Sequence, residues 1–344
     1  MNFVFFGTPE YAAIILGKLI DAGFVPVAVI CNPDRPVGRK KILTAPPTKI
    51  LAQKYNIPVW QPETLTTKNP AKNGALADPS VVQESGPGLG IRNNKHIVNS
   101  NSLSSGNVDN SISEPAEGFA PSGPGIPSPG PHYAAGSQDL LYQNWDFFVV
   151  AAYSKILPKE ILDIPRLGTV GVHPSLLPKY RGPTPIQSAI LAGEKETGVT
   201  LYLLDEKMDH GPILSNEKLV MSNEETTETL TKKLAELGAD LLIKLLPLME
   251  APQLAGALEP QGESQATYTK KFKTEDAFVD LEKDSPIEIE RKIRALNPEP
   301  GVFTLSPSKG GHRRMKILEV ELTPEGKLKL KKIQYEGGKL IELS

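Results

Sequence analysis

Short apolar runs alternate with amphipathic segments in the first part of the chain. Residues 2–6 are mostly apolar and lead through G-T-P-E into a segment whose apolar residues recur at helical spacing. The same pattern predicts strands at residues 25–31, 57–61 and 147–152 and a helix at residues 47–55. This alternation predicts a parallel, doubly wound α/β sheet with helices on both faces. The active site is then expected at the carboxyl ends of the strands.

The second part of the chain changes its pattern twice. A long helix is predicted at about residues 225–250, and its apolar stripe should lie in the core. The stripe consists of Leu230, Leu234, Leu237, Leu241 and Leu245. Residues 251–265, rich in Pro, Gly and Gln, indicate a linker. A small β domain should follow, with a helix at 286–296 and short strands at 302–305, 315–322, 328–334 and 340–343.

Residues 71–137 show neither the apolar runs of strands nor the helical spacing of apolar residues. They are dominated by Pro, Gly, Ser and Asn and end in G-P-G-I-P-S-P-G-P. Such a segment buries too little apolar surface to offset its ordering entropy, so a disordered insertion is predicted. It enters at the amino end of the strand at 147–152, opposite the expected site; a partner-binding tail is the alternative. The first predicted domain therefore consists of residues 1–70 and 138–250, and the second of residues 266–344.

Composition narrows the functional classes. The 344 residues, 39% of them hydrophobic, are enough for two ordered domains, and the formal net charge of −2 gives no global attraction to nucleic acid. Cys31 is the only cysteine, which excludes an internal disulfide and a multi-cysteine metal site. A reducing, cytoplasmic setting is expected. No apolar run approaches the roughly 18 residues needed to cross a bilayer, so membrane insertion is not expected. Met1 leads almost directly into the apolar residues 3–6 without a charged leader, so secretion is not expected either.

Residues 168–214 concentrate polar groups that sheet packing does not require. His173 follows an apolar strand, and Asp209 lies in a polar loop after a strand at residues 200–204. A carboxylate beside an imidazole favours the protonated ring and can hold one tautomer, so the pair suits general base catalysis. A purely structural histidine is the alternative.

Two basic segments could contact phosphates. One is the loop after the second strand, and the other is residues 306–332, where Lys and Arg outnumber Glu. Phosphate contacts and a solvated basic face are both compatible with this balance.

Seven motifs together resemble one known family, methionyl-tRNA formyltransferase. The resemblance covers about residues 1–70 and 138–304, with the motifs in the expected order. The motifs are F-F-G-T-P-E, P-D-R-P-V-G-R, Q-P-E-T-L, A-A-Y-S-K-I-L-P, H-P-S-L-L-P-K-Y-R-G-P-T-P-I-Q, T-G-V-T and M-D-H-G-P-I-L.

This resemblance implies a Rossmann-like catalytic domain followed by an OB-like domain. It implies transfer of a formyl group from 10-formyltetrahydrofolate to the amino group of methionine on initiator tRNA, the first step towards translation initiation. His173 and Asp209 match two of the family's three catalytic residues, and Gly171 occupies the position of the third, an Asn. The family's folate-binding turn corresponds to Ser175, Leu176, Leu177 and Pro178, and its tRNA-contacting loop to Arg35, Arg39, Lys40 and Lys41.

Two positions and the length of the last domain depart from the family pattern. Gly171 cannot supply a side-chain donor to the oxyanion, a loss typically worth about 10²–10³ in rate, so impaired activity or a substitute donor is expected. On that basis Gly171→Asn should raise the rate. Ser154 replaces a glycine lining the folate pocket, and the short last domain leads us to expect an incomplete barrel.

Two other functions stay open at this point. One is a related folate-dependent N-formyltransferase acting on an amino sugar nucleotide or a purine precursor. The other is a catalytically weak homologue that binds folate or tRNA. In each case we expect a monomer that uses no metal and has no membrane partner.

Overall fold

The computed structural model of the chain describes residues 1–38, 41–65, 144–251, 258–308 and 311–343. These residues fall within one compact unit. The predicted insertion at 71–137 lies outside them, so its disorder and its place away from the site stay predictions.

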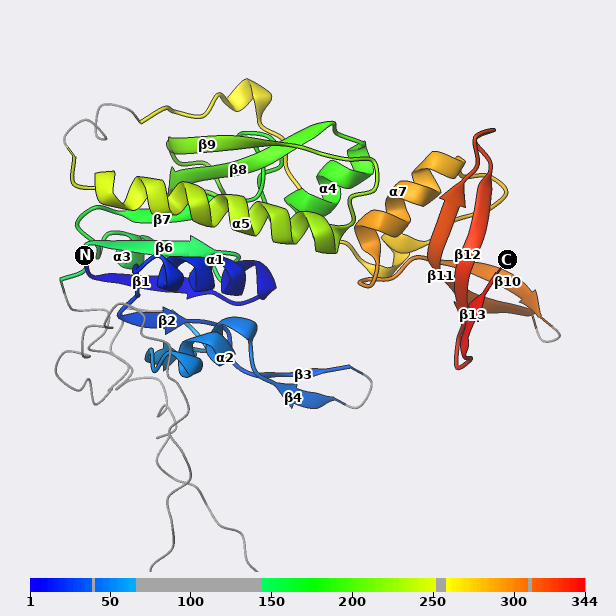
Figure 1. Cartoon of the computed structure of the whole chain (residues 1–344), viewed down its shortest axis with the longest axis horizontal. Coiled ribbons are helices and arrows are strands. Elements are labelled where there is room, and N and C mark those ends of the chain that lie inside the picture. The colour runs from blue at the N-terminus through cyan, green and yellow to red at the C-terminus, as the bar shows by residue number, and fades with distance from the viewer. Residues whose placement is uncertain (39–40, 66–143, 252–257, 309–310, 344) are drawn as a thin grey trace, which may run out of the picture. The chain divides into compact units, whose positions relative to one another are not determined.

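A seven-stranded sheet, with the strand order β5-β2-β1-β6-β7-β8-β9, forms the centre of the first domain (Figure 1). The first five strands are mutually parallel, which confirms the predicted Rossmann-like class. β8 runs antiparallel to β7, and β9 runs antiparallel to β8, which corrects the prediction of a wholly parallel sheet. The sequence did not predict this, because a hydrophobic pattern does not encode strand direction. The bounds are β1 (Phe3–Gly7), β2 (Ala28–Ile30), β5 (Val59–Trp60), β6 (Phe147–Ala151), β7 (Thr169–His173), β8 (Glu196–Leu203) and β9 (Ile213–Val220).

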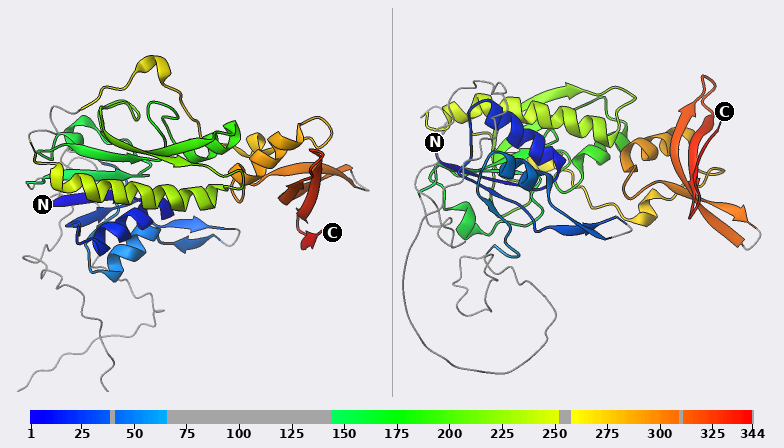
Figure 2. Two further views of the ribbon diagram at one scale, coloured as in Figure 1. Left: turned by 45° about the horizontal axis from the view of Figure 1, so that its top comes forward. Right: turned by 60° about the horizontal axis from the view of Figure 1, so that its bottom comes forward.

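Helices cover both faces of this sheet. Successive β1 residues point to opposite faces, so Phe5 packs with α1 (Glu10–Asp21) and α5 (Thr227–Leu245), while Phe6 packs with α3 (Lys159–Leu162). Figure 2 shows α1 and α5 side by side on one face. The predicted leucine stripe of α5 is in the core, with Leu237 only partly buried. The remaining helices here are α2 (Pro47–Lys54), α4 (Pro185–Ala192) and the 3-10 turn η3 (Leu246–Leu248).

A small hairpin follows β2 where the sequence predicted only a loop. It pairs β3 (Arg35–Val37) with β4 (Ile42–Thr44) in antiparallel register. Strands of three residues, one of them containing Pro36, are too short to produce a periodic pattern. Val37, Ile42 and Leu43 are exposed.

The last domain begins with α7 (Pro286–Leu296), which Ser285 and Glu288 cap at its amino end. Four antiparallel strands follow in chain order, as the sequence predicted: β10 (Phe303–Ser308), β11 (Gly311–Leu322), β12 (Leu328–Tyr335) and β13 (Leu340–Glu342). An OB barrel has five strands, whereas this sheet has four among the described residues. The segment before α7 contains the 3-10 turns η4 (Glu263–Gln265) and η5 (Thr274–Ala277).

Candidate functional site

His173 is the last residue of β7 and is nearly buried, with 7% of its side chain exposed. Its Nε2 lies 2.9 Å from the backbone oxygen of Tyr180. A carbonyl oxygen only accepts, so Nε2 carries the proton in the neutral ring and the lone pair is on Nδ1. The Tyr180 carbonyl therefore sets the tautomer, a role that the sequence assigned to Asp209.

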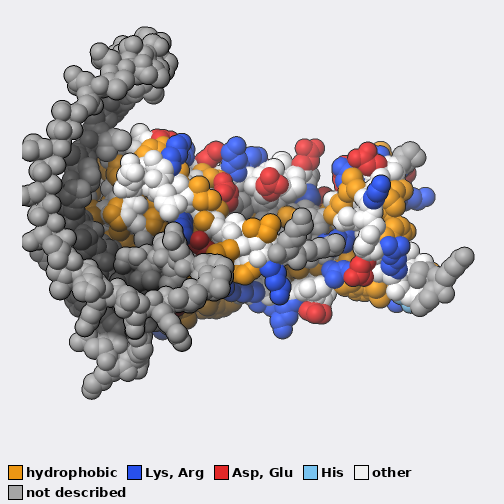
Figure 3. Space-filling model, turned by 90° about the horizontal axis from the view of Figure 1, so that it is seen from below, with side chains coloured by type: hydrophobic (Ala, Val, Ile, Leu, Met, Phe, Trp, Pro, Cys, Tyr) orange, Lys and Arg blue, Asp and Glu red, His pale blue; other side chains and the backbone are white. Residues whose placement is uncertain are grey.

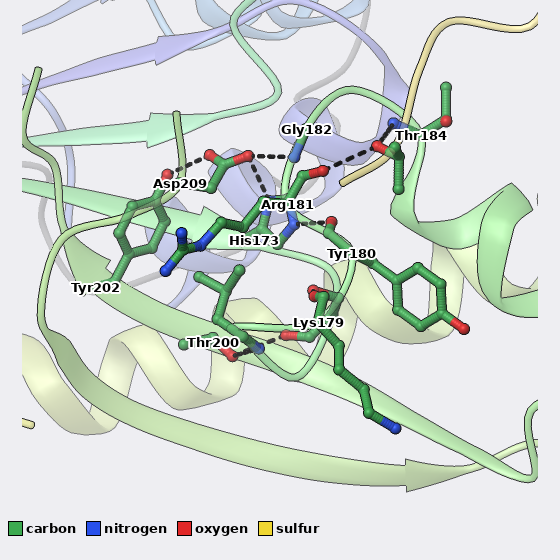
Figure 4. A network of polar contacts seen from close by, with 12 residues as sticks. His173, Lys179, Tyr180, Arg181, Gly182, Thr184, Thr200, Tyr202 and Asp209 are labelled. Atoms are coloured by element: carbon green, nitrogen blue, oxygen red, sulfur yellow. Dashed lines mark hydrogen bonds and ion pairs between the residues drawn. The ribbon is translucent and has the colours of Figure 1, made fainter. Parts of the chain in front are cut away.

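Asp209 faces the free nitrogen of that ring. Its Oδ2 lies 3.7 Å from His173 Nδ1, which is ion-pair distance and too long for a hydrogen bond (Figure 4). The Tyr202 hydroxyl donates to Oδ1 at 2.6 Å, and the Gly182 amide donates to Oδ2 at 2.6 Å. Asp209 has φ 49°, a left-handed conformation that Asp tolerates better than most residues. The carboxylate is thus held from two sides and lies beside an atom that can accept a proton.

Tyr202 is a site residue that the sequence analysis missed. It lies in β8 directly opposite Gly171 of β7, and its side chain is almost fully buried. Burial, together with the neighbouring Asp209 carboxylate, raises the pKa of the phenol well above its ordinary value. The hydroxyl therefore keeps its proton and stays a donor. In sequence it was one large residue within an apolar strand, a pattern typical of core.

Gly171 does not leave an open space in the site. A Cβ atom at this position would lie 2.7 Å from Cζ of Tyr202 and 2.5 Å from Cδ1 of Leu204, both closer than real contacts allow. The ring of Tyr202 occupies the volume that a side chain at position 171 would fill. The expected gain from Gly171→Asn therefore rested on space that does not exist.

The predicted folate turn follows His173 directly and is tied to β8. The Thr200 hydroxyl donates to the Ser175 carbonyl at 2.7 Å and accepts from the Leu177 amide at 3.0 Å. Ser175 and Leu177 are buried, and Leu176 and Pro178 are half-buried. The Ser175 hydroxyl donates to the Lys179 carbonyl at 2.6 Å, so it is already used within the turn. Thr200 was not singled out in sequence, since a threonine in a strand is ordinary.

Other polar residues lie at the carboxyl ends of the neighbouring parallel strands. Asn32 follows β2; its backbone amide donates to Thr8 Oγ1 at 3.1 Å, and its Nδ2 donates to Ser154 Oγ at 2.9 Å. Ser154 follows β6, and its hydroxyl oxygen accepts this bond from Asn32. The buried Asn32 Oδ1 has no hydrogen-bond partner among the described residues.

Arg181 is another residue that the sequence analysis did not single out. Its side chain is fully buried, and its guanidinium contacts Gln261 Oε1 at 2.9 and 3.0 Å, Glu263 at 2.9 Å and the Tyr268 hydroxyl at 3.0 Å. Gln261 in turn donates to the backbone oxygens of Asp209 and Gly211, at 3.0 and 2.8 Å. The predicted linker thus supports the loop that carries Asp209.

The predicted tRNA-binding residues are only partly described. Arg35 and Lys41 are exposed in the β3–β4 region, whereas Arg39 and Lys40 lie outside the described residues. Seen from the side of this hairpin, Lys and Arg side chains stand among exposed hydrophobic ones (Figure 3). The two described cations lie on a surface that a large ligand could reach.

A cavity of about 410 Å³ lies at the opposite end of β7, beside Gly168 and Thr169. His210 and Asp205 line it, and their side chains form a second His/Asp contact at 2.6 Å. The other nitrogen of His210 lies 3.3 Å from Glu263, so both nitrogens of the ring face carboxylates. The cavity is lined by neither His173 nor Asp209. The cavity is therefore separate from the candidate site at His173 and Asp209.

No group of three or more His, Cys, Asp or Glu side chains that could hold a metal ion is found among the residues described. Over the same part of the chain, no helix has the length and hydropathy needed to cross a membrane.

Comparison with known proteins defines the class of this fold. The chain matches the formyl transferase family over residues 131–246 and the formyl transferase C-terminal domain over residues 271–344. The sugar 3N-formyl transferase WlaRD has the same fold, with a TM-score of 0.51 at 16% identity over 94% of this chain and 87% of that one. An N-formyltransferase from Helicobacter canadensis gives a TM-score of 0.50 at 17% identity, covering 93% of this chain and 87% of that chain. The class is therefore a two-part formyl transferase.

Two curated relatives identify the branch of this class. The methionyl-tRNA formyltransferase of Chloroflexus aggregans is 37% identical over 304 residues, covering 88% of this chain and 76% of the relative. That of Kosmotoga olearia is 33% identical over 365 aligned positions, covering 99% and 94%. The chain belongs to the methionyl-tRNA formyltransferase family, whose members are one-carbon transferases.

Proposed function

We propose that this chain transfers the formyl group of 10-formyltetrahydrofolate to the amino group of methionine carried by initiator tRNA. Membership of the family supports the reaction type, and the free Nδ1 of His173 beside Asp209 carries the assignment of the site. The co-substrate supplies the formyl group, and the protein supplies proton transfer, orientation and charge stabilisation.

His173 acts as the general base through Nδ1. The attacking amine loses a proton as its nitrogen bonds to the formyl carbon, and the Nδ1 lone pair accepts that proton. The charged ring then faces the Asp209 carboxylate at 3.7 Å, which stabilises it. The same proton passes to the departing folate nitrogen when its bond to the formyl carbon breaks, so the ring is restored to its starting form.

The strand ends beside His173 suit a polar co-substrate. The buried, unpartnered Asn32 Oδ1 is an acceptor that a bound ligand with N–H groups can satisfy. The turn from Ser175 to Pro178 borders the same edge and presents Leu176 and Pro178 as half-buried apolar surface. We assign these groups to the folate, with His173 at the formyl end.

We assign the tRNA to the β3–β4 region. Arg35 and Lys41 are exposed cations there, and Arg39 and Lys40 lie between them in sequence. Phosphate contacts from such cations position a nucleic acid without reading its bases. Residues 306–332, where Lys and Arg outnumber Glu, offer a second set of cations for phosphate contacts.

The test measures formylation of initiator Met-tRNA with 10-formyltetrahydrofolate, beside equilibrium binding of the folate. His173→Ala should lower kcat about 10³-fold, within the usual contribution of a general base, and leave folate affinity within about twofold. His210→Gln is the matched control, because His210 forms a closer pair with Asp205 outside the site; its kcat should stay within about threefold of wild type. A larger loss in the control than in His173→Ala would place the base at His210.

The acceptor is tested in the same assay. Replacing Met-tRNA by dTDP-3-aminofucose distinguishes the amino sugar alternative, and formylation of that compound alone would contradict the proposal. Folate binding without turnover on any acceptor would favour a homologue that binds and does not catalyse.

A further inference from the structure

The strand register places Gly171 of β7 directly opposite Tyr202 of β8. Residues opposite each other in an antiparallel pair project their side chains to the same face. Since Gly171 has no side chain, the Tyr202 ring lies over its Cα, with Leu204 closing the other side. Any larger residue at position 171 would have to displace that ring.

The position of the ring determines where the hydroxyl lies. From above Gly171, Tyr202 reaches Asp209 and donates to Oδ1 at 2.6 Å, opposite the Gly182 amide on Oδ2 (Figure 4). Its ring also meets the His173 ring edge to face, with centroids 6.5 Å apart. Tyr202 is therefore in contact with both members of the proposed catalytic pair.

We propose that Tyr202 is a positioning residue for formyl transfer, and that position 171 is glycine because this tyrosine needs the space. Tyr202 holds Asp209 where its charge faces His173 Nδ1, and Gly171 makes that placement possible. The inference rests on the proposed function for its catalytic part. It replaces the expectation that glycine at 171 is a defect: the two positions form one unit, and Gly171→Asn lowers activity.

The first experiment removes only the hydroxyl. Tyr202→Phe keeps the ring above Gly171, so we expect kcat to fall about tenfold, in line with loss of one hydrogen bond to a charged group, while both KM values stay within about twofold. Tyr11→Phe is the matched control: Tyr11 is buried, and its hydroxyl has no partner among the described residues. Unchanged kcat in Tyr202→Phe would overturn the positioning role.

A merely structural role is separated by combining variants. If Tyr202 acts through Asp209, Tyr202→Phe should add less than about twofold to the loss already caused by Asp209→Asn. A full tenfold loss in that background would mean that the hydroxyl acts independently of Asp209, and would overturn the inference.

The second experiment tests the shared space. Gly171→Asn and Tyr202→Met should each lower kcat and the melting temperature. In the double variant, the loss of kcat and the loss of melting temperature should each be smaller than the two single losses together predict. Met suits the double variant because its unbranched side chain can bend away from a new neighbour. Additive losses in both quantities would overturn the coupling.

Measuring both formylation and thermal unfolding distinguishes failure of the proposed function from failure of this inference. If the wild-type protein does not formylate Met-tRNA, the proposed function fails, whereas the coupling of positions 171 and 202 in thermal unfolding is still measured. If the wild-type protein is active and the variants behave additively, the inference fails and the proposed function stands.

Discussion

Asp209→Asn removes the charge of the proposed pair and preserves its shape. The amide oxygen can accept from Gly182, and the amide nitrogen can donate to the Tyr202 hydroxyl oxygen, which accepts equally well. Both contacts that fix residue 209 thus survive the change. The Tyr202 hydroxyl proton nevertheless loses its acceptor, so we expect the melting temperature to fall by about 2–4 °C.

The effect on rate follows from the distance of 3.7 Å between Nδ1 and Oδ2. Two unit charges at this separation attract by about 4 kcal/mol at an effective dielectric constant of about 20. The Asp209 side chain is 18% exposed and its charge is shared with two donors, so we expect roughly 2–3 kcal/mol to be lost from the charged transition state. At about 1.4 kcal/mol per factor of ten, kcat should fall about 10²-fold.

The assay is steady-state formylation at saturating folate and Met-tRNA, with thermal unfolding of each variant. His173→Ala with Asp209→Asn should be little slower than His173→Ala alone, because the carboxylate acts through the ring. A kcat of Asp209→Asn within threefold of wild type would refute the electrostatic role. Multiplied losses in the double variant would show that the two residues act separately.

Three other predictions concern the rest of the chain. Arg35→Ala should raise the KM for tRNA, leave that for folate unchanged and lower the slope of log affinity against log salt by about one; an unchanged slope would remove Arg35 from the contact surface. Arg181→Met should lower the free energy of unfolding by about 2–4 kcal/mol, measured by urea denaturation, because Gln261 and the Tyr268 hydroxyl lose the donor that bonds them; a loss below 1 kcal/mol would contradict this. Burial would raise the pKa of Glu225, yet hydrogen bonds from Lys233 and Thr229 and the Lys233 charge lower it below its ordinary value. The stabilisation by this carboxylate is thus complete above about pH 4.5 and is lost as the pH falls through the lowered pKa. Glu225→Gln should therefore be less stable than wild type at pH 7 and approach it only as the pH falls below that lowered pKa; a stability difference that is independent of pH would be evidence against this.

The sequence predicted most of the fold because the elements are locally encoded. Alternation of apolar strands with amphipathic helices located β1, α1, β6 and α5 within a few residues. The direction of β8 could not be predicted, since a buried strand shows the same apolar run whichever way it points. The strands of the β3–β4 hairpin were too short to show an alternation of apolar and polar residues.

Some residues of the candidate site could be predicted from the sequence, and others could not. His173 and Asp209 stood out because charged or titratable groups beside strand ends need a reason. Tyr202 and Thr200 did not, since both fit a strand without further explanation, and their roles depend on a cross-strand register that one sequence does not show. The meaning of Gly171 depended on the same register: as an isolated residue it implied a missing donor, and beside Tyr202 it implies an occupied space.

The bonds from Gln261 to the carbonyls of Asp209 and Gly211 have a consequence for dissecting the protein. The predicted boundary at residue 250 would assign Gln261, and with it Glu263, to a connector that could be cut away. A fragment ending there would expose the guanidinium of Arg181 and release the loop bearing the carboxylate, although every proposed catalytic side chain would still be present. The smallest portion able to catalyse should therefore extend through Thr269, whose amide bonds back to Arg181. Residues Gln261, Glu263 and Thr269, which precede the last domain, thus belong structurally to the domain that carries the site.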